Sequence, residues 1–517
     1  MARLAMSKTL ANIDLGLDEI LEEKLKLLSP GFSTFRILRK SVDARGREPR
    51  FILSVEVFGK GETPTNETYE VDKLNVSKNM PPVLIIGAGP AGLFAALRLC
   101  ERGIPSILFE QGSEAVPRMK KIAEYWRYGK FDKKNNVCFG EGGAGLYSDG
   151  KLITRIKSPH IPYVLNRLVQ FGAPEEIQYL ANPHVGSDKI RKVIAPMREW
   201  LKANGCDVRF DTKVSALLYE KNRVAGVQLE DGTRVEGFSV ILATGHSAVD
   251  IIYHLRDNQV AMEGKSFAVG LRIEHPQKKI DAIQYGGYAG HKSLGAANYK
   301  LTDHDHQTGI GVYSFCMCPG GYVIASSTED SGVVSNGMSN YARNSPYANA
   351  AIVVSVDHEK NFGKNLFGGM EFRTQLEQAA KRAVQSTGGT KEFPAQRVVD
   401  FLDGKLGKIL PGSSPSGAMG VRLDELLPKD MVSQLRKSLL QFNRKMPGFT
   451  SIDAQLYGIE SRTSCPVRVV REDETLQSST HPDLYPTGEG AGYAGGITSA
   501  AVDGVRVAEA IVERVRK

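Results

Sequence analysis

The chain has 517 residues, 41% of them hydrophobic and 24% charged, which allows two or three globular domains. Its net charge of +8 is spread along the chain, whereas nucleic-acid-binding proteins usually gather basic residues in one patch, so an anionic cofactor or substrate is expected and nucleic acid is not. The sequence has no apolar run of the roughly 18 residues that cross a bilayer and no apolar signal-peptide core. Its six cysteines lack the paired spacing of a disulfide framework, which suggests a reducing compartment. We therefore expect a soluble, cytoplasmic protein without a transmembrane segment.

Residues 1–78 are predicted to form a small α/β cap ahead of the first buried strand. The amphipathic pattern of Asp18–Leu28 predicts a helix, and the runs Phe35–Ser41 and Arg50–Phe58 predict two strands joined by a polar turn. The polar stretch Val76–Met80 is the expected linker to the rest of the chain.

The next segment, PPVLIIGAGPAGLFAALRLCERGIPSILFEQG, has the strand–turn–helix–strand order of a dinucleotide-binding unit. The apolar run Val83–Ile86 leads into a glycine-rich turn, a helical pattern follows, and a second strand, Ile107–Phe109, ends at Glu110. The turn holds the predicted phosphate-binding residues Gly87, Gly89, Pro90, Ala91 and Gly92.

Each glycine of this turn has an expected role. Gly87 permits the tight turn, Gly89 lets the backbone approach a pyrophosphate, and Gly92 lets the helix pack closely on the strand. The phosphates are expected on the free N–H groups of the helix N-terminus. Glu110, 23 residues after Gly87, is placed to bind ribose hydroxyls.

The remaining patterns predict a Rossmann-like domain assembled from discontinuous segments, with a β-sheet inserted into it. A helix is expected at 188–204, and short strands are expected at 207–210, 215–219, 223–229 and 239–243. Several β-rich runs between residues 266 and 358 are separated by turns rather than helices, which favours an antiparallel sheet. Helices at 428–442 and 498–515 complete the pattern. The expected domains are the cap at 1–78, the dinucleotide-binding domain at 79–262 and 453–517, and an inserted substrate domain at 263–452.

Two later glycine-rich segments favour FAD over NAD. The run VILATGHS ends a predicted strand at Thr244-Gly245, a turn small enough to pass close to a cofactor phosphate or ribose. In LYPTGEGAGYAGG, Glu489 after Gly488 is placed to hydrogen-bond a ribityl chain. Gly496 and Ile497 open a long helix whose N–H groups can face the flavin N1–C2=O edge. Nicotinamide has no ribityl chain, so such a terminal element suits a flavin.

With these motifs the chain resembles the flavoproteins that have a glutathione-reductase-like FAD-binding domain, and more narrowly the uncharacterised FAD-dependent dehydrogenase family. The matching segments run in order through most of the chain: FRILRKSVDAR (35–45), FGEGGAGLYSDGKL (139–152), NPHVGSDKIR (182–191), GLRIEHPQ (270–277), SFCMCPGGYV (314–323), SNGMSNYAR (335–343), GIESRTSCP (458–466) and LYPTGEGAGYAGG (484–496). The resemblance implies FAD binding and a ferredoxin-like N-terminal cap, and it identifies no substrate.

The loop FGEGGAGLYSDGKL is predicted to cross the pyrophosphate and lie against the isoalloxazine ring, because its glycines let backbone N–H groups reach a ligand. A mobile surface loop is the alternative. Ser148 and Lys151 are placed to touch phosphate or flavin N5. The further cofactor contacts expected are Gly142, Gly143 and Ala144 of this loop and Val214 beside the strand at 215–219.

Cys316 and Cys318 lie two apart in a predicted strand, so both side chains are expected on one face. If that face is the flavin face, the thiols could exchange electrons with the ring. Buried structural thiols, which are inert, are the alternative.

Other polar residues are candidates for substrate chemistry. Arg462 is placed to clamp a substrate carboxylate, with Glu460 holding it, although a structural ion pair is equally compatible. His246 follows the ATG turn and could act as an acid–base group or order its loop through a hydrogen bond. His304 and His306 resemble a metal pair, but without a third ligand no metal site is expected.

These features predict an FAD-dependent oxidoreductase, a dehydrogenase or reductase, that moves a hydride between a small organic substrate and flavin N5. No built-in NAD(P)H domain is expected, so a separate electron donor or acceptor such as NAD(P)H, oxygen or a quinone would close the cycle. One alternative is a flavin-dependent monooxygenase that uses NAD(P)H and oxygen. The other is a non-catalytic flavin-binding redox sensor.

Overall fold

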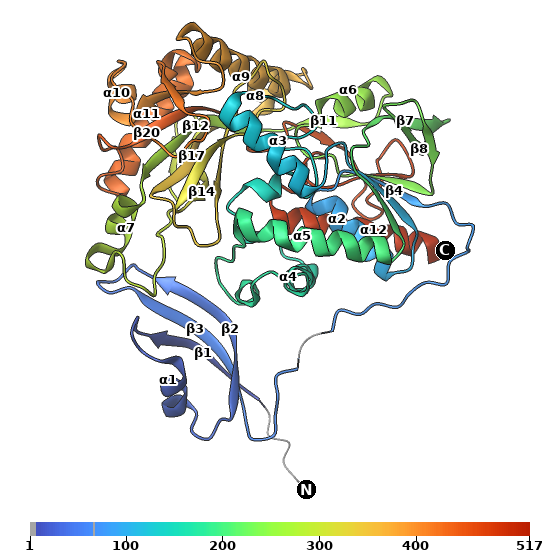
Figure 1. Ribbon diagram of the computed structural model, residues 1–517, viewed down its shortest axis with the longest axis horizontal. Helices are drawn as coiled ribbons and strands as arrows, with labels where there is room; N and C mark the ends of the chain where they lie inside the picture. Colours follow the sequence, from blue (N-terminus) through green and yellow to red (C-terminus); the bar gives the residue numbers. More distant parts are fainter. Residues whose placement is uncertain (1–6, 66–67, 517) are drawn as a thin grey trace.

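The computed structural model describes residues 7–65 and 68–516. Figure 1 shows a small N-terminal unit, a sheet covered by helices, and a second sheet that has helices of its own. Within the described ranges, no helix is both long enough and apolar enough to cross a membrane.

The N-terminal unit, residues 7–58, is a three-stranded antiparallel sheet with one helix. Its elements are β1 (Lys8–Leu15), α1 (Leu21–Leu28), β2 (Thr34–Asp43) and β3 (Arg50–Phe58), with strand order β1-β3-β2. The predicted helix and two strands are confirmed, and β1 was not predicted because only Ile13 and Leu15 of this strand are buried. The βαββ order is shorter than the βαββαβ order of a complete ferredoxin-like fold.

The dinucleotide-binding part is built on a five-stranded parallel sheet whose strands come from distant segments. They are β4 (Val83–Ile86), β5 (Ser106–Phe109), β6 (Cys206–Arg209), β10 (Ser239–Leu242) and β22 (Leu484–Pro486), in the order β22-β10-β4-β5-β6. Side chains alternate between the two faces, so Val83 and Ile85 enter one hydrophobic cluster and Leu84 and Ile86 another. The predicted assembly from discontinuous segments is confirmed.

Helices α2 (Pro90–Glu101), α5 (Gly186–Ala203) and α12 (Ile497–Arg516) cover one face of this sheet (Figure 1). Helix α4 (His160–Gln170) packs on α12, and α3 (Ala115–Tyr128) lies between this part and the inserted part. A Cβ on Gly504 of α12 would lie 2.0 Å from the Ala91 carbonyl oxygen of α2, so these helices touch backbone to backbone. The other face packs against α6 (Val249–Asp257) and a small antiparallel sheet of β7 (Val214–Glu220), β8 (Arg223–Leu229) and β9 (Arg234–Glu236).

The inserted part is built on a seven-stranded sheet in the order β13-β14-β17-β12-β20-β18-β19. The strands are β12 (Phe267–Pro276), β13 (Thr302–His304), β14 (Gly311–Cys318), β17 (Tyr347–Val356), β18 (Phe393–Arg397), β19 (Ala418–Gly420) and β20 (Gln455–Glu460). All neighbours are antiparallel except β18 and β19, as the turn-rich sequence predicted. Strand β20, expected in the C-terminal part of the dinucleotide-binding domain, pairs with β12 and β18 and so belongs to this sheet.

Helices interrupt the inserted part more often than the sequence indicated. The predicted helix at 428–442 is confirmed as α11 (Lys429–Lys445). The helices that were not predicted are α7 (Gln277–Tyr285), α8 (His358–Phe362), α9 (Gly368–Ser386) and α10 (Val398–Asp403). Two strand pairs complete the fold: β15 (Gly321–Ala325) with β16 (Ser335–Ser339), and β11 (Met262–Gly264) with β21 (Val467–Val469). The expectation that turns alone separate the strands was wrong at α7, which lies between β12 and β13 and buries Ile280 against the sheet.

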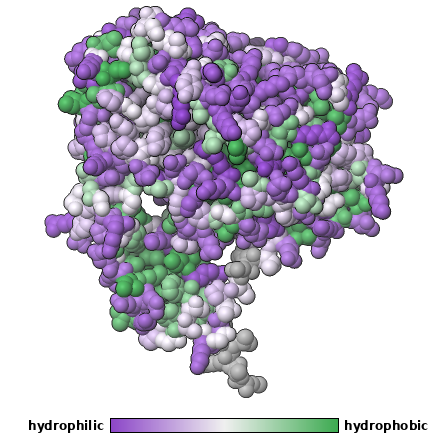
Figure 2. All heavy atoms as spheres, in the orientation of Figure 1, coloured by the Kyte–Doolittle hydropathy of each residue, from purple (hydrophilic) through white to green (hydrophobic). Residues whose placement is uncertain are grey.

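The N-terminal unit exposes apolar side chains, and Figure 2 shows a hydrophobic area on it. Its large exposed apolar residues are Ile20, Leu27, Leu28, Leu38 and Val42.

Candidate cofactor cavity and active site

A cavity of about 640 Å³ opens at the carboxyl ends of the parallel strands, the edge at which open α/β sheets bind their ligands. Its walls include glycine-rich turns that follow β4, β10 and β22, together with the loop at 143–145. The opposite wall comes from the inserted part through Phe315 and Cys316 of β14, Asn336 of β16 and Glu460 of β20. The cavity therefore joins the two large sheets.

The turn after β4 requires its glycines. Gly87 has a φ of +106°, and a Cβ on it would lie 2.4 Å from the Ala243 carbonyl oxygen. A Cβ on Gly92 would lie 1.9 Å from the Gly87 carbonyl oxygen. Gly89 differs, because a Cβ there would meet nothing within 4 Å and would project from the cavity wall.

The N-terminus of α2 faces this cavity with free donors. The first backbone bond of the helix runs from the Leu93 N–H to the Gly89 carbonyl, 2.9 Å. Pro90 has no N–H, and the N–H groups of Ala91 and Gly92 precede that bond, so helix geometry leaves them without a carbonyl partner. Such an end binds phosphate through N–H groups and the helix dipole.

The loop predicted to cross the pyrophosphate lies directly on this turn. The Gly142 N–H donates to the Ala88 carbonyl at 2.8 Å. A Cβ on Gly143 would lie 3.1 Å from the Gly89 Cα, so a side chain there would push the two segments apart. The loop is thus part of the binding wall.

A buried arginine shapes this loop from behind. Arg118 of α3 is fully buried and donates hydrogen bonds of 2.6–3.3 Å to main-chain carbonyls of the loop. Its acceptors are the carbonyls of Asn136, Val137, Gly140, Glu141 and Gly143. No predicted motif contains Arg118, and its place at the start of the basic run 118–121 is the sequence signal that could have indicated it.

Glu110 ends β5 as predicted and accepts backbone hydrogen bonds. Its Oε2 accepts from the Ala88 N–H at 2.9 Å, and its Oε1 accepts from the N–H groups of Gly112 (3.0 Å) and Gly140 (2.9 Å). A carboxylate offers about four acceptor positions. Three backbone donors leave one acceptor position on Oε2 for a ribose hydroxyl.

The turns after β10 and β22 meet each other. A Cβ on Gly490 would lie 2.4 Å from the Gly245 carbonyl oxygen, so the two turns contact through their backbones. Glu489 accepts the Cys465 N–H through Oε1 at 2.8 Å and lines the cavity. Burial raises the pKa of its carboxyl group.

Glu460 and Arg462 do not hold one another, which corrects the expected pairing. Glu460 accepts two hydrogen bonds of 2.9 Å from the fully buried Arg272 of β12. Arg462 instead donates from Nε (3.1 Å) and Nη2 (2.9 Å) to the two carboxylate oxygens of Glu377 in α9. Strand β20 ends at Glu460, so the alternation that would place both side chains together does not extend to Arg462.

Arg462 also has too few free donors for the expected bidentate clamp on a substrate carboxylate. Its Nη1 donates to Ser247 Oγ at 2.8 Å and to Thr328 Oγ1 at 2.7 Å. Together with the two bonds to Glu377, these leave one N–H of the guanidinium unassigned. Arg462 still places a fixed positive charge at the cavity wall.

His246 is connected to Arg462 through Ser247. Ser247 Oγ accepts from Arg462, so its hydroxyl proton is free to donate to His246 Nδ1, 2.7 Å away. Burial, followed by the charges of Arg462 and Arg373, lowers the pKa of His246 to about 3, so the ring is neutral. A neutral imidazole whose Nδ1 accepts has its proton on Nε2. With Ser247 as the donor to Nδ1, the neutral ring of His246 has an N–H donor at Nε2.

Cys316 and Cys318 have different surroundings, contrary to the expectation of one shared face. Cys316 has a φ of +44°, and a register shift separates the pairs of Phe315 and Cys318 with β17. This bulge breaks the alternation of the strand. Cys316 lines the cavity, whereas Cys318 is fully buried and donates from its thiol to the Cys316 carbonyl at 3.3 Å.

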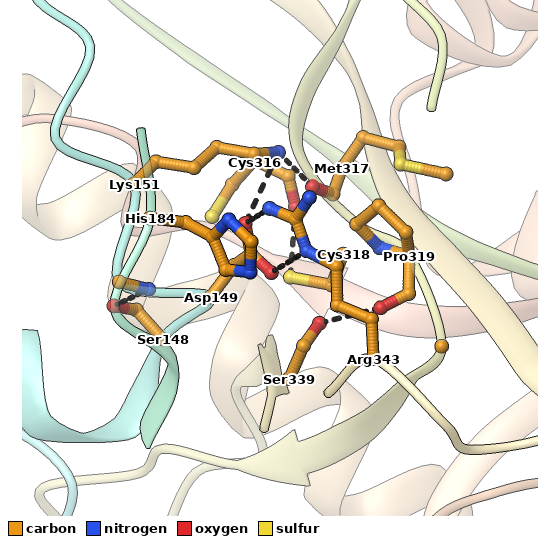
Figure 3. A network of polar contacts seen from close by, with 12 residues as sticks. Ser148, Asp149, Lys151, His184, Cys316, Met317, Cys318, Pro319, Ser339 and Arg343 are labelled. Atoms are coloured by element: carbon orange, nitrogen blue, oxygen red, sulfur yellow. Dashed lines mark hydrogen bonds and ion pairs between the residues drawn. The ribbon is translucent and has the colours of Figure 1, made fainter. Parts of the chain in front are cut away.

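Figure 3 shows the polar network around these thiols. Lys151 Nζ donates to the Met317 carbonyl and lies 3.8 Å from Asp149 Oδ2. Asp149 also accepts from Arg343 Nε at 3.0 Å. Ser148 is occupied within its own loop, since its hydroxyl donates to the Gly145 carbonyl and accepts from the Gly150 N–H, both at 3.0 Å.

Within the part of the chain that the structure describes, no cluster of three or more His, Cys, Asp or Glu side chains could hold a metal ion. The rings of His304 and His306 contact each other edge to face, with centroids 4.9 Å apart.

Sequence comparisons match three segments of the chain. A family profile described as "FAD binding domain" matches residues 80–122, and one described as "FAD-dependent protein, C-terminal domain-like" matches residues 266–463. Residues 10–58 match a domain of unknown function, DUF8436. A protein of Clostridium beijerinckii (strain ATCC 51743 / NCIMB 8052), described as uncharacterized, is 39% identical over 534 residues and covers 98% of this chain and 99% of its own.

The chain belongs to the same family as this clostridial protein. The cofactor of the present chain is FAD.

Solved flavoprotein structures align over most of the chain at low similarity. A mutant of halogenase PltM in complex with FAD is 10% identical with a TM-score of 0.40, covering 85% of this chain and 70% of its own. Glycine oxidase from Bacillus cereus ATCC 14579 is 11% identical with a TM-score of 0.33, covering 84% and 98%. These values assign neither a substrate nor a reaction.

The described residues fit FAD. Gly89 and Gly245 present open backbone on the cavity wall, where a Cβ would meet nothing within 4 Å, and the α2 N-terminus offers free N–H groups beside Gly89. Glu110 keeps an acceptor position for ribose. The cavity lining runs from Glu110 at the end of β5 to Cys316 of β14, so one cavity contacts both the expected ribose-binding carboxylate and the inserted sheet.

Most of the residues expected at the site are brought together. Those lining the cavity are Gly87, Gly89, Pro90, Ala91, Glu110, Gly143, Ala144, Ser148, Lys151, Val214, Thr244, Gly245, His246, Cys316, Glu460, Arg462, Gly488, Glu489, Gly496 and Ile497. Gly92, Gly142 and Cys318 lie behind the wall; Gly92 and Gly142 act through close backbone packing. Lys213 and Lys265 line the cavity and were not predicted. Adjacency to Val214 could have indicated Lys213, but no motif contains Lys265.

Proposed function

We propose that the protein is a dehydrogenase or reductase in which a hydride passes between a small organic substrate and N5 of the bound flavin. The observation that carries this proposal is the single cavity joining the dinucleotide-binding turns to polar side chains of the inserted sheet. FAD supplies the two-electron chemistry at N5 when it is bound. Because Cys316 of β14 and Arg462, which follows β20, lie on the cavity wall, the inserted part would hold the substrate against the flavin.

The protein's own groups suit a reaction in which negative charge develops. His246 donates from Nε2, and Arg462 is held in place by Glu377 with a positive charge that cannot titrate near neutral pH. Donors fixed in advance toward developing negative charge stabilise a transition state without reorganising. Arg462 and His246 would therefore stabilise a substrate oxyanion or the negative charge of reduced flavin.

The electron partner is proposed to be a separate molecule, either NAD(P)H or an acceptor such as oxygen or a quinone. The test begins with the visible spectrum of the purified protein. NADH or NADPH is then added without oxygen while the flavin band near roughly 450 nm is followed. A band that is bleached quickly supports a reductase, and a band that persists until a metabolite reduces it supports a dehydrogenase.

Two results would overturn the proposed function. NADPH-dependent oxygen uptake with hydroxylated product would instead indicate a monooxygenase. A flavin that is photoreduced and changes the protein's shape, yet is reduced by no nicotinamide and by no metabolite in a broad screen, would indicate a redox sensor.

A further inference from the structure

We propose that Cys316 and Cys318 form a redox-active thiol pair that exchanges two electrons with the flavin, so that the protein stores two electrons in addition to those on FAD. This inference rests on the proposed function, because the flavin must cycle between its oxidised and reduced forms. It goes further by naming a second redox centre in the chain.

The geometry of β14 places one thiol at the cavity and the other directly beneath it. Cys316 lines the cavity, and Cys318 is fully buried next to it, with its thiol hydrogen-bonded to the Cys316 carbonyl at 3.3 Å. The bulge also brings the two side chains into direct contact, with the thiol groups within hydrogen-bonding distance of each other, as disulfide formation requires.

The surroundings hold this bulge in place. Arg272 Nη1 donates to the Cys316 carbonyl at 3.4 Å, and Lys151 donates to the Met317 carbonyl (Figure 3). A Cβ on Gly337 would lie 3.0 Å from Cys318 Sγ and 2.4 Å from Arg272 Nη1. Glycine at this position therefore makes room for both the thiol and the arginine.

The charges around the pair favour a thiolate on the outer cysteine. Contact with the Cys318 thiol lowers the pKa of Cys316 to about 7, and the nearby charges of Arg272 and Lys151 act in the same direction, against burial and the charge of Glu460. The same contact and burial raise the pKa of Cys318. Near neutral pH the outer cysteine therefore loses its proton readily while the inner one stays a thiol, which supplies the thiolate and the thiol that disulfide formation requires.

The proposed step balances with oxidised flavin as the oxidant. The Cys316 thiolate and the Cys318 thiol lose two electrons in total, an S–S bond forms, and the S–H bond of Cys318 breaks. The two electrons and that proton pass to the flavin, which becomes its anionic reduced form. In the reverse direction, reduced flavin cleaves the disulfide and restores one thiolate and one thiol.

The first measurement is an anaerobic titration of the air-oxidised, FAD-loaded protein with dithionite. We expect complete reduction to consume two equivalents of dithionite per FAD, because each equivalent delivers two electrons. The Cys316→Ser and Cys318→Ser variants should each consume one equivalent, so that the dithionite uptake per FAD falls twofold. Cys206→Ser is the matched control and should consume two, since Cys206 and Cys100 form another contacting thiol pair that is buried and does not line the cavity.

The second measurement does not depend on flavin absorbance or on variants that fold. Wild-type protein is oxidised through its FAD without oxygen, unfolded in N-ethylmaleimide and mapped by mass spectrometry. We expect the peptide with both cysteines to lack the label and to have lost two hydrogens, and protein reduced with dithionite to have two labels there.

Uptake of one equivalent by the wild type, with both cysteines labelled after oxidation, would overturn the thiol pair while leaving a reducible flavin and the proposed function intact. A protein that takes up no FAD would overturn both, and the missing flavin band distinguishes that case.

Discussion

Gly89 and Gly92 stand three residues apart in the same turn, but they have different physical roles. A Cβ on Gly92 would lie 1.9 Å from the Gly87 carbonyl oxygen, so Gly92→Ala should move the strand–helix junction. We expect a loss of at least about 2 kcal/mol in the free energy of unfolding of the FAD-free protein. Urea unfolding followed by circular dichroism measures this change.

Gly89→Ala should leave the fold intact and weaken FAD binding. Gly89 has a φ of −77°, which alanine adopts readily, and its Cβ would meet no protein atom within 4 Å. The unfolding free energy should stay within about 0.5 kcal/mol of wild type, whereas FAD affinity should fall by about tenfold or more because the methyl group occupies the approach to the pyrophosphate. Equal FAD affinity in this variant would place the phosphates elsewhere.

His246 should make the fold sensitive to acid. Its pKa is lowered to about 3 in the folded protein, whereas an unfolded histidine titrates near about 6.5. Between these values the unfolded chain binds the extra proton, so stability falls as the pH drops below about 6.5. At pH 5 this contribution amounts to about 2 kcal/mol.

We therefore expect His246→Gln to reduce by about 2 kcal/mol the stability lost between pH 7.5 and pH 5. Urea unfolding of FAD-free protein at both pH values tests this, and His306→Gln, at an exposed loop position, is the control. If wild type and His246→Gln lost the same unfolding free energy between pH 7.5 and pH 5, the His246 ring would have to be charged in the folded state at pH 5.

The sequence predicted which residues line the cavity better than it predicted their partners. Gly87, Glu110 and Glu489 belong to local motifs whose spacing along the chain dictates their position. The partners of Arg462 and Glu460 could not be predicted, because Glu377 and Arg272 lie 85 and 188 residues away in sequence. Such pairings depend on how the sheets pack, which local patterns do not encode.

At the level of secondary-structure elements, α3 acts on the cavity through Arg118. This side chain is fully buried and donates to carbonyls of the loop that lies on the turn at Gly89. Hydrogen bonds from a charged donor contribute about 1.5–3 kcal/mol each, and losing the donor leaves buried carbonyls unpaired. Arg118→Met should therefore cost more than about 3 kcal/mol in unfolding free energy and lower FAD affinity by at least about tenfold.

Lys120→Met is the matched control, since Lys120 lies on the exposed face of the same helix. Flavin fluorescence quenching gives the affinity and urea unfolding gives the stability. If Arg118→Met kept wild-type FAD affinity, the loop would not depend on this arginine for its shape.

Secondary structure was predictable where the local pattern and the tertiary packing agree. The apolar runs of β4 and β10 are buried on both faces, and both were predicted as strands. The long helix α9 was not predicted, and it begins with Gly368-Gly369, residues of low helix propensity. A Cβ on Gly369 would lie 2.7 Å from the Phe267 ring, so tertiary contact requires the glycines that local propensity disfavours.

At the scale of the whole molecule, the N-terminal unit makes few contacts with the FAD-binding part, whereas the segment that follows the unit packs on it. The unit has its own hydrophobic cluster around Leu25. The first residue that lines the cavity is Ile86, so none of the described residues of the unit contributes to the cavity wall. Its contacts with the rest of the protein include backbone hydrogen bonds of 2.8 Å between Lys40 and residues 179–181, and a hydrogen bond of 3.2 Å from Ser293 Oγ to the Leu17 carbonyl. The cavity should therefore survive removal of the unit.

The following segment instead packs on the FAD-binding part. The ring of Tyr69 lies 6.1 Å from that of Tyr163 in α4, and the Leu74 N–H donates to the Arg102 carbonyl at 2.8 Å. Leu74, Val76 and Met80 pack against the main hydrophobic cluster.

A protein that starts at residue 61 keeps this segment and should bind FAD with an affinity within about threefold of the full chain, a difference of about 0.6 kcal/mol. A protein that starts at residue 81 lacks the segment and should lose several kcal/mol of stability, because the apolar surface that the segment buries is removed. Titration of both truncated proteins with FAD, together with urea unfolding, measures the difference. Equal losses of affinity in the two proteins would mean that the N-terminal unit itself supports the cavity.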